Sequence, residues 1–490
     1  MSSKDSSSES KLTAEVVKFM REGDSVAKTS NGNTNDVIKE AIPVSGLVGE
    51  ETAKVTVTEY TNPEASPRSQ AMPTATTRAL ASAHRWEDLD MTNELRRGIL
   101  EKGFIKPSKI QELVLPLIQD GRNIIGQAQN GSGKTATFAL GLLSRINLGL
   151  KTFQALILSP TRELAIQNLD VVEALGKYTG KSDVWIGGVS EVDFGKIRIM
   201  PDILLQILSG TPGKVLDLIT KRVIDTRNVS MFVLDEADTM IQVHNNMGAA
   251  VNNIRSVLPK HDLQILLFSA TYPENVRRFA LNLVPHASKI QVSKEDLTLS
   301  TIWQTFINTG KNFQNKVQIL SDLYAAMNVS QSIIFVNSRV TAFNLAKLLR
   351  DEGHSVSLIC GTQMNGAEQI SPEYRDKIMD EFRNKVTKVL IATDVLARGI
   401  DVPAVTLVVN FELPIDYSDG PNNGKCNYET YLHRIGRTGR FGRKGIAVNL
   451  VSEGELELVA DIENYFPGTK VDELTVDEID TLEDRLKKLR

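Results

Sequence analysis

The sequence predicts an α/β protein of two parallel-sheet domains, joined by a short linker and preceded by a mostly disordered N-terminal extension. Short apolar runs alternate with longer amphipathic stretches from Trp86 onward, which is typical of parallel sheets with crossover helices. A polar stretch, SKEDLTLST, interrupts this alternation once. The length of 490 residues also favours two or three domains. We place the domains at residues 86–294 and 302–490, with the linker at 295–301.

The extension, residues 1–85, is rich in Ser, Thr, Asn, Ala and Glu and contains only two aromatic residues, Phe19 and Tyr60. Such a segment cannot bury enough apolar area to offset the entropy lost on ordering. We therefore predict disorder and a regulatory role. Residues 12–20 place apolar side chains at helical spacing, which is equally consistent with a partner-binding helix, an inhibitory helix or a transient helix without function.

Each predicted domain contains five apolar runs that we expect to be strands. In the first domain they are NIIGQA, QALILSP, LLQILSG, MFVLDEAD and QILLFSAT, and in the second SIIFVN, VSLICG, KVLIATD, TLVVNF and GIAVNLV. No residue-level repeat relates the two halves, so their similarity is one of architecture. In open parallel sheets, ligands bind beyond the carboxyl ends of the strands, and polar motifs follow several of these runs.

A glycine-rich loop follows the first of these strands. Its backbone N–H groups can surround a phosphate of ATP, Lys134 can reach the outer phosphates, and Thr135 can offer a hydroxyl to Mg²⁺. Ala128 stands where the general pattern has glycine. The loop supplies seven candidate nucleotide-binding residues: Gln129, Asn130, Gly131, Ser132, Gly133, Lys134 and Thr135.

The stretch MFVLDEADTM places three carboxylates, Asp235, Glu236 and Asp238, directly after a buried strand. Like charges so close together repel each other, so a cation is expected nearby. We interpret this cation as metal-bound ATP: Asp235 holds Mg²⁺, and Glu236 orients and deprotonates the attacking water.

Asp238 lies too far along the chain to share the metal. We expect it to accept hydrogen bonds from groups that move with the nucleotide state, such as Ser269, Thr271 or His433.

Composition excludes several other classes of protein. The formal net charge of −4 gives no global attraction to nucleic acid, so a polyanion site must be a local groove. Two cysteines, Cys360 and Cys426, are too few for a disulfide scaffold or a four-ligand zinc site. The N-terminus does not resemble a secretory signal, and no apolar run approaches the roughly 18 residues of a membrane span. We expect a monomer in the cytoplasm, the nucleus or both.

Nine motifs occur in order between residues 103 and 440: GFIKPSKIQ, AQNGSGKT, PTREL, TPGK, DEAD, SAT, IIFVNSR, ATDVLARGID and HRIGRTGR. With them the chain resembles the DEAD-box RNA-dependent ATPases over essentially everything after Trp86. The resemblance implies two RecA-like domains that close on ATP and single-stranded RNA, bend the strand and so disrupt short duplexes. It also implies RNA contacts made mainly to phosphate and sugar.

The resemblance assigns further roles by position. Gln111 would read the adenine edge and Trp86 would stack on that base, supported by Phe104 and Pro107. Asp401 would hold the ribose, and Arg437 and Arg440 would contact the transition-state phosphoryl group. The implied RNA-contacting residues are Thr161, Arg162, Gly188, Thr211, Gly213, Lys214, Arg339, Gly361, Arg375 and Thr393. Three features depart from the family pattern: Trp86 stands where the family more often has Phe, Asn130 replaces Ser or Thr, and the segment before Arg375 differs in sequence and length.

Within the family, the long polar loop of FELPIDYSDGPNNGKCNYETYLHRIGR and the segments LGKYTG and VDELTVDEID resemble one branch. That branch acts in mRNA export at the cytoplasmic face of the nuclear pore. The resemblance implies three kinds of partner: messenger RNA–protein complexes, a nucleoporin that competes with RNA on the first domain, and an export activator that uses inositol hexakisphosphate.

Two alternatives stand beside an ATP-driven RNA remodeller, and the second lacks sequence support because GFIKPSKIQ and the DEAD motif belong to the RNA family. One is an ATP-gated RNA clamp that serves as a placeholder in another RNA-processing or translation assembly, and slow RNA release in ATP would identify it. The other is a phosphate-loop ATPase that acts on DNA, which stimulation by DNA in place of RNA would identify.

Overall fold

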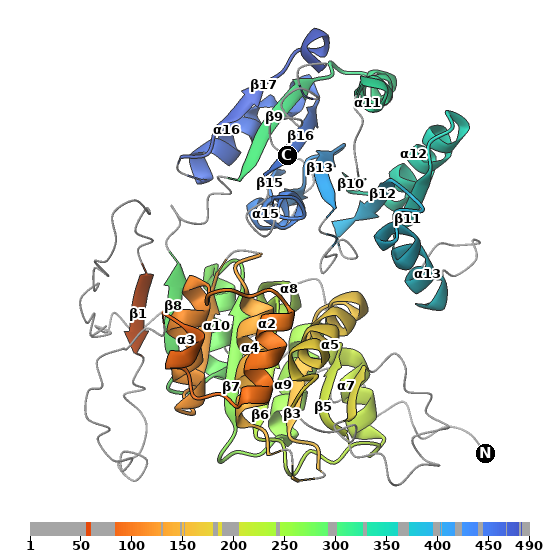
Figure 1. Cartoon of the computed structure of the whole chain (residues 1–490). Helices are drawn as coiled ribbons and strands as arrows, with labels where there is room; N and C mark the ends of the chain where they lie inside the picture. Colours follow the sequence, from red (N-terminus) through yellow and green to blue (C-terminus); the bar gives the residue numbers. More distant parts are fainter. Residues whose placement is uncertain are drawn as a thin grey trace, which may run out of the picture. The chain divides into compact units, whose positions relative to one another are not determined.

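The computed structural model describes residues 55–59, 84–128, 131–147, 149–150, 152–179, 185–188, 205–241, 246–292, 301–326, 331–360, 372–394, 402, 404–416, 424–439, 444–466, 468–479 and 482. These residues form two α/β domains, each built on a largely or wholly parallel sheet (Figure 1), which confirms the predicted fold class. The predictions of disorder before residue 84, apart from residues 55–59, and of a helix at 12–20 lie outside the described residues. The linker, except for Thr301, also lies outside them.

The first domain contains an eight-stranded sheet with the order β1-β8-β2-β7-β6-β3-β5-β4. Every neighbouring pair is parallel except β1 and β8, which are antiparallel. The strands are β1 Val55–Glu59, β2 Ile124–Gln127, β3 Ala155–Leu158, β4 Trp185–Gly188, β5 Leu205–Gly210, β6 Met231–Leu234, β7 Gln264–Ser269 and β8 Ser288–Val292. All five runs that we predicted as strands of this domain are strands.

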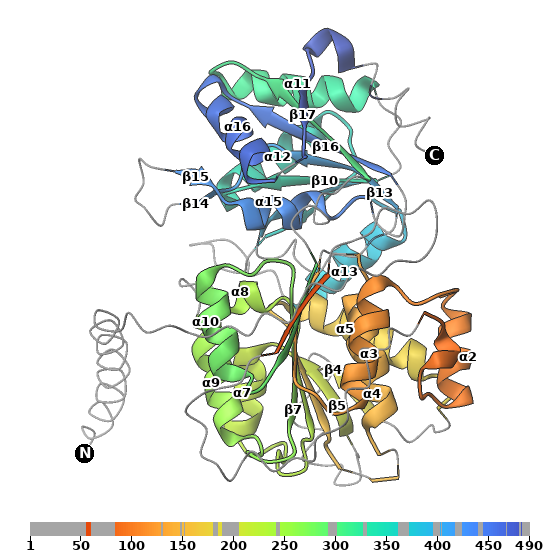
Figure 2. The ribbon, with the colours of Figure 1, turned by 90° about the vertical axis from the view of Figure 1, so that its left-hand side faces the viewer.

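Helices cover both faces of this sheet (Figure 2). On one face lie η2 Trp86–Asp88, α2 Asn93–Glu101, α3 Lys109–Gln119, α4 Lys134–Arg145 and α5 Arg162–Gly176. On the other lie α7 Pro212–Thr220, α8 Ala237–Ile241, α9 Met247–Val257 and α10 Glu274–Leu283. Because side chains alternate along a strand, Leu266 and Phe268 of β7 enter the first core while Ile265 and Leu267 enter the second. A strand buried on both faces reads as a continuous apolar run, which explains why these strands were recognisable.

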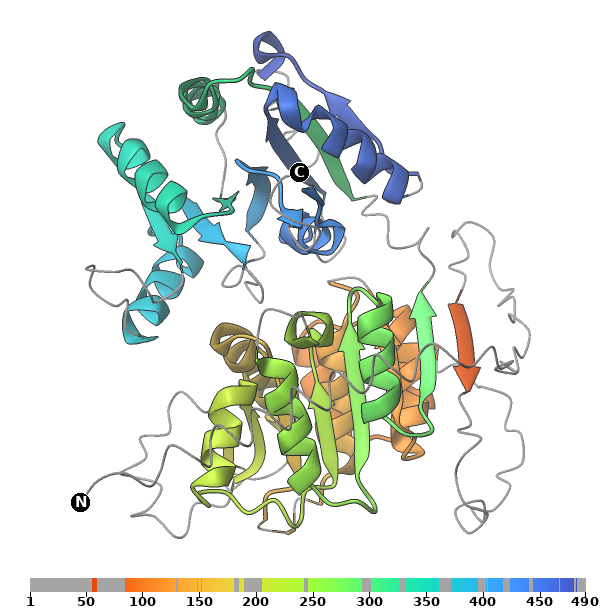
Figure 3. The same cartoon turned by 180° about the vertical axis from the view of Figure 1, so that it is seen from behind.

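Three strands of this sheet were not predicted. Strand β1 is the edge strand next to β8 (Figure 3). The two strands pair from Val55 opposite Val292 to Glu59 opposite Ser288. It belongs to the extension, where average composition indicates no ordered element. The others, β4 and β8, lack a long apolar run: β8 is SKIQV, which mixes polar and apolar residues.

The second domain contains a seven-stranded, wholly parallel sheet with the order β11-β12-β10-β13-β16-β9-β17. Its strands are β9 Ile302–Asn308, β10 Gln331–Val336, β11 Val356–Ile359, β12 Val389–Thr393, β13 Val405–Asn410, β16 Gly445–Val451 and β17 Val471–Glu473. A separate antiparallel pair consists of β14 Ile415–Asp416 and β15 Lys425–Cys426. The five predicted strands are again present, and β9 and β17 are additions at one side of the sheet.

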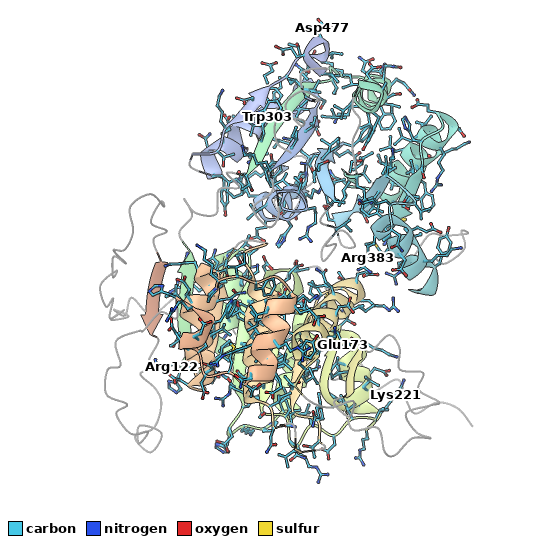
Figure 4. All side chains as sticks on the ribbon, viewed as in Figure 1. Arg122, Glu173, Lys221, Trp303, Arg383 and Asp477 are labelled. Atoms are coloured by element: carbon cyan, nitrogen blue, oxygen red, sulfur yellow. The ribbon has the colours of Figure 1, made fainter. Side chains whose placement is uncertain are left out.

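Helices again pack on both faces of the second sheet. One core includes residues of α11 Phe313–Ala326 and α12 Arg339–Asp351. Leu474 and Ile479, on either side of η5 Val476–Glu478 in the chain, belong to the same core. Two cores on the opposite face include residues of α13 Pro372–Arg383, α15 Tyr428–Ile435 and α16 Leu456–Tyr465; η4 Glu453–Glu455 precedes α16. The edge strand β17 pairs with β9. Trp303 of β9, labelled in Figure 4, also donates its indole N–H to Asp472 Oδ2 of β17 at 2.8 Å.

Within the described part of the chain, the longest helices fall short of the length and apolar character that a bilayer crossing requires.

Candidate nucleotide and RNA site

The phosphate loop begins where β2 ends and leads directly into α4. Gly131 and Gly133 have φ values of 81° and 99°, in the left-handed region that glycine adopts without strain. A Cβ at Gly133 would also lie 2.8 Å from Gln111 Nε2, so any side chain here would collide with the neighbouring helix α3. The Ser132 Oγ is buried without a hydrogen-bond partner among the described residues. The described part of the loop therefore offers an unsatisfied polar group for a ligand at the N-terminus of α4.

Lys134 is the first residue of α4 and is buried. Its Nζ donates to the carbonyl of Ala128 at 2.7 Å, so the side chain folds back along the loop. Burial lowers the pKa of Lys134, while the carboxylates of Asp235, Asp238 and Glu236 oppose that change. An added anion such as a triphosphate would favour the charged form of this lysine.

Gln111 lies in α3 and links the loop to the segment before that helix. Its Oε1 accepts from the backbone N–H of Ser108 at 2.7 Å, and its Nε2 donates to the Gly133 carbonyl at 3.4 Å. Trp86 is 5% exposed and donates its indole N–H to the carbonyl of Phe104 at 3.0 Å. Pro107, which lies between Phe104 and Gln111 in the sequence, is also buried. The structure thus joins Trp86 to Phe104 and Gln111 to the phosphate loop; base recognition by these residues stays a prediction.

Asp235 follows β6 and is 3% exposed. Its Oδ2 accepts from Asn168 Nδ2 at 2.9 Å, and its Oδ1 accepts from the backbone N–H of Glu236 at 3.0 Å. Burial raises the pKa of Asp235 to about 6, and the nearby charge of Glu236 adds to the rise. Lys134 and the hydrogen bond from Asn168 act in the opposite direction. At neutral pH the carboxylate is therefore ionised but poorly compensated, which favours a cation beside it.

Glu236 adopts a φ of 51°, a left-handed conformation that is uncommon for a residue with a side chain and costs roughly 1 kcal/mol or more. Its side chain is buried, and its Oε2 has no hydrogen-bond partner among the described residues. The other oxygen, Oε1, lies 3.8 Å from Nη2 of Arg437 in the second domain. Backbone strain and a buried, unsatisfied acceptor at one residue are typical of a functional position.

Asp238 is held by both domains. Its Oδ2 accepts from the backbone N–H of Thr271 at 3.2 Å and from Thr271 Oγ1 at 2.5 Å, and lies 3.2 Å from Nε2 of His433. Ser269 contributes indirectly, because its hydroxyl donates to the Thr271 carbonyl at 2.7 Å. The structure therefore brings together the residues that we expected around Asp238.

His433 and Arg437 lie on and just after α15, and the Arg437 Nε donates to the His433 carbonyl at 3.0 Å. Both side chains are 3% exposed. The cation expected near the three carboxylates is thus supplied in part by the chain itself, through Lys134 and Arg437. The remaining predicted nucleotide residues Gln129, Asn130, Asp401 and Arg440 lie outside the described residues, as does Gly361 of the RNA set.

The predicted RNA-contacting residues lie at the carboxyl ends of strands or at the first turns of helices. Thr161 caps α5 by accepting the Leu164 N–H at 3.2 Å, and the half-buried Arg162 begins that helix. Gly188 ends β4, and Thr393 ends β12. The others begin helices: Thr211, Gly213 and Lys214 at α7, and Arg339 at α12. Exposed backbone N–H groups at helix starts suit phosphate binding.

Arg375 of α13 forms a contact that the sequence did not indicate. Its Nη1 lies 3.6 Å from Oε1 of Glu163, whose side chain is 4% exposed. Glu163 directly follows Arg162. Arg375, which we assigned to RNA, is therefore paired with the acidic neighbour of Arg162, which we also assigned to RNA. Only the spatial meeting of α5 and α13 places them together, and no sequence motif could have revealed it.

No prediction from the sequence named Asn168 or Arg434. Asn168 is fully buried in α5 beside Asp235, seven residues after Thr161, a spacing close to two helical turns. Arg434 is 1% exposed and ion-pairs with Asp394, while its Nη2 donates to Asn337 Oδ1 at 2.7 Å and its Nη1 to the Glu412 carbonyl at 2.6 Å. The helical spacing of Asn168 from Thr161 and the position of Arg434 within HRIGRTGR were the available signals in the sequence.

The residues present fit a nucleotide with a divalent cation. The chemistry of the donors, one hydroxyl on Thr135 and one carboxylate on Asp235, suits Mg²⁺, which is usually held by one or two protein oxygens together with phosphates and water. The unsatisfied Ser132 Oγ and Glu236 Oε2 are further polar atoms available to a bound substrate.

Comparison with known proteins identifies two matching family models. The model described as DEAD/DEAH box helicase matches residues 108–279, and the one described as helicase conserved C-terminal domain matches residues 315–442. The curated "ATP-dependent RNA helicase DBP5" of Kluyveromyces lactis is 39% identical over 412 residues, covering 84% of this chain and 83% of that protein. The protein of the same name from Saccharomyces cerevisiae strain S288c is 40% identical over 413 residues, covering 84% and 81%.

Solved structures are similar as well. S. cerevisiae Dbp5 bound to RNA and ADP BeF3 matches with a TM-score of 0.73 and 38% identity, over 83% of this chain and 100% of that one. A variant of S. cerevisiae Dbp5 bound to Nup159, a variant of Gle1, IP6 and ADP matches with a TM-score of 0.58 and 37% identity, over 81% and 99%.

Proposed function

The chain belongs to the DEAD/DEAH box family of ATP-dependent RNA helicases, and from this premise we propose that it remodels messenger RNA–protein complexes in mRNA export. In this proposal the two domains close on ATP and single-stranded RNA, and hydrolysis of ATP reopens them and releases the RNA.

The single observation that carries the proposed chemistry is the buried cluster of Lys134, Asp235 and Glu236 with Arg437. A phosphate loop, two carboxylates and an arginine from the other domain are the parts that phosphoryl transfer to water requires. Glu236 in particular combines a strained backbone with a buried carboxylate oxygen that no described residue satisfies.

The proposed mechanism assigns one task to each residue. Lys134 faces the outer phosphates, and Thr135 and Asp235 hold Mg²⁺, which neutralises charge on those phosphates when it is bound. Glu236 accepts a proton from the water whose oxygen forms the new bond to the terminal phosphorus, while the bond to the departing ADP oxygen breaks. Arg437 stabilises the negative charge on the transferred group.

Asp238 then links the nucleotide state to the position of the second domain. It accepts hydrogen bonds from Thr271, within the first domain, and lies within hydrogen-bond distance of His433 on α15. A shift of the first-domain strand ends when phosphate leaves would alter this junction and favour opening. RNA contacts by the residues at the starts of α5, α7 and α12 hold the strand through its phosphates, which explains binding without a basic overall charge.

The partners that we propose are a cytoplasmic nucleoporin and an export activator that uses inositol hexakisphosphate, with function at the cytoplasmic face of the nuclear pore. Support comes from the similar Dbp5 variant, which was solved with Nup159, a variant of Gle1 and IP6. It comes also from the extent of the similarity, which covers both domains. An increase in ATP hydrolysis on adding such an activator would test this part.

The catalytic assignment is tested with Glu236→Gln, which keeps the shape of the side chain but removes its basicity. We expect the variant to bind ATP and fluorescent single-stranded RNA but to release the RNA much more slowly than wild type in ATP and Mg²⁺. Glu274→Gln, on the exposed start of α10, is the matched control and should behave as wild type. RNA release and ATP hydrolysis at wild-type rates in Glu236→Gln would exclude Glu236 as the base.

The substrate class is tested separately on the wild-type protein. ATP hydrolysis should be stimulated by single-stranded RNA far more than by DNA of the same sequence. Equal stimulation by DNA would contradict RNA as the substrate, and RNA retained through many minutes in ATP would favour the clamp over the remodeller.

A further inference from the structure

The fully buried side chain of Asn168 connects α5 to the carboxyl ends of two strands. Its Nδ2 donates to Asp235 Oδ2 at 2.9 Å and to Ser159 Oγ at 3.0 Å. We propose that Asn168 is a positioning residue that fixes the carboxylate of Asp235 in the orientation needed to hold Mg²⁺. This inference rests on the proposed function, in which Asp235 is a ligand of the metal.

The carboxylate of Asp235 is held from two sides. Asn168 donates to Oδ2, and the backbone N–H of Glu236 donates to Oδ1 at 3.0 Å. Each oxygen has a further lone pair free for a cation or for water of its shell. Because Mg²⁺ demands near-ideal octahedral geometry, a carboxylate that can rotate loses affinity, and donors to metal ligands matter for this reason. Without Asn168, the adjacent backbone N–H of Glu236 would be the one remaining hydrogen-bond donor to the group among the residues that the structure describes.

The orientation of the Asn168 amide follows from chemistry. An ionised carboxylate only accepts hydrogen bonds, so the NH₂ group must face Asp235 and the carbonyl Oδ1 must point elsewhere. That Oδ1 is buried and has no hydrogen-bond partner among the residues that the structure describes. A buried acceptor without a donor destabilises the fold, whereas an apolar side chain of similar size would avoid this cost. Stability alone therefore does not account for an asparagine at this position, and orientation of Asp235 does.

Ser159 completes the arrangement. It directly follows β3 and is fully buried, and its backbone N–H donates to the Gly210 carbonyl at 3.0 Å. Its hydroxyl oxygen accepts the second hydrogen bond from the Asn168 NH₂ group. The amide is thus fixed by a strand end next to β6, which carries Asp235. Through Asn168, the helix α5 and the end of β3 together fix the orientation of the Asp235 carboxylate.

The test compares Asn168→Leu, which keeps the size of the side chain without a donor, with Ser209→Ala. Ser209 Oγ donates to the Ala165 carbonyl at 2.8 Å, so this control removes a buried hydrogen bond of the same helix that involves neither Asn168 nor Asp235. The full-length proteins are loaded with a non-hydrolysable ATP analogue, and bound Mn²⁺, which takes the same oxygen ligands as Mg²⁺, is titrated by electron paramagnetic resonance. Nucleotide affinity in EDTA is measured in parallel.

We expect the Mn²⁺ affinity of Asn168→Leu to fall about tenfold or more, with an altered spectrum, while its nucleotide affinity in EDTA stays at the wild-type value. Ser209→Ala should match wild type in both. Wild-type Mn²⁺ affinity in folded Asn168→Leu would overturn the proposal. If Asn168→Leu does not fold, Asn168→Ser takes its place, because the serine side chain is too short to reach both Asp235 and Ser159. The same fall in Mn²⁺ affinity is expected, and wild-type Mn²⁺ affinity would overturn the proposal.

Failure of the proposed function would look different. Wild-type protein would then bind nucleotide without any dependence on the metal, or would hydrolyse ATP without stimulation by RNA. If only the inference about Asn168 fails, wild type keeps its metal dependence and Asn168→Leu is indistinguishable from it.

Discussion

Replacing Asp235 by asparagine should stabilise the nucleotide-free protein at neutral pH while weakening its Mg²⁺-dependent binding of nucleotide. Asp235 is 3% exposed, and burial followed by repulsion from Glu236 raises its pKa to about 6. A carboxyl group whose pKa is raised on folding opposes folding whenever it is ionised. An amide carries no charge, so it avoids this opposition, but it is a poorer ligand for a hard cation.

The expected size follows from the two pKa values of Asp235. The difference between about 6 in the folded state and 3.8 in the unfolded chain corresponds to about 3 kcal/mol at neutral pH. The folded state binds more protons than the unfolded state between these values, so the unfavourable contribution is complete above pH 6 and declines as the pH falls toward 3.8. The amide oxygen keeps one of the two present hydrogen bonds, and losing the other costs about 1 kcal/mol. A net gain of about 2 kcal/mol would raise Tm by roughly 4–8 °C.

The measurement is thermal unfolding of nucleotide-free protein in EDTA at pH 7.5 and pH 5. We expect Asp235→Asn to melt above wild type at pH 7.5, and the electrostatic part of the gain to be about half as large at pH 5. The control is Asp225→Asn: the hydrogen bond from Arg227 lowers the pKa of this exposed carboxyl, so its removal should not stabilise. A Tm for Asp235→Asn at or below that of wild type at both pH values would refute the argument from desolvation.

Three further variants test other parts of the structure. Lys134→Ala should abolish productive binding of a fluorescent ATP analogue, and near-normal affinity in the folded variant would contradict the phosphate-loop assignment. Arg437→Ala should lower kcat of RNA-stimulated ATP hydrolysis with little change in KM, whereas an unchanged kcat with a raised KM would exclude a transition-state contact. Gly98→Ala places a Cβ 2.1 Å from the Leu175 carbonyl oxygen, so it should lower stability by about 1–3 kcal/mol, and an unchanged Tm would show that α2 and α5 can separate freely.

Strands buried on both faces were predictable because each gives a continuous apolar run, as in Met231–Leu234 and Gln264–Ser269. The edge strands Val55–Glu59 and Trp185–Gly188 each have one neighbouring strand, and the inner strand Ser288–Val292 mixes polar and apolar residues. None of the three has such a run, so the sequence around them indicated no strand. In the candidate nucleotide site, residues that follow one another in a motif could be proposed from the sequence. The partners that act across the fold were not: Asn168 meets Asp235 from another element, as Glu163 meets Arg375.

The contacts of Arg434 restrain α15, the helix of the second domain that positions His433 and Arg437. The buried side chain of this arginine is bonded to Asp394, Asn337 and the Glu412 carbonyl, so the helix α15 that carries it cannot rotate or slide without breaking several of these bonds. His433 and Arg437 lie on either side of Arg434 in the chain. In the proposed mechanism, His433, which lies beside Asp238, and Arg437, which lies beside Glu236, would therefore move together with α15. If these proposed roles hold, a partner that tilts α15 by a small angle would remove both contacts in a single step, without touching the nucleotide.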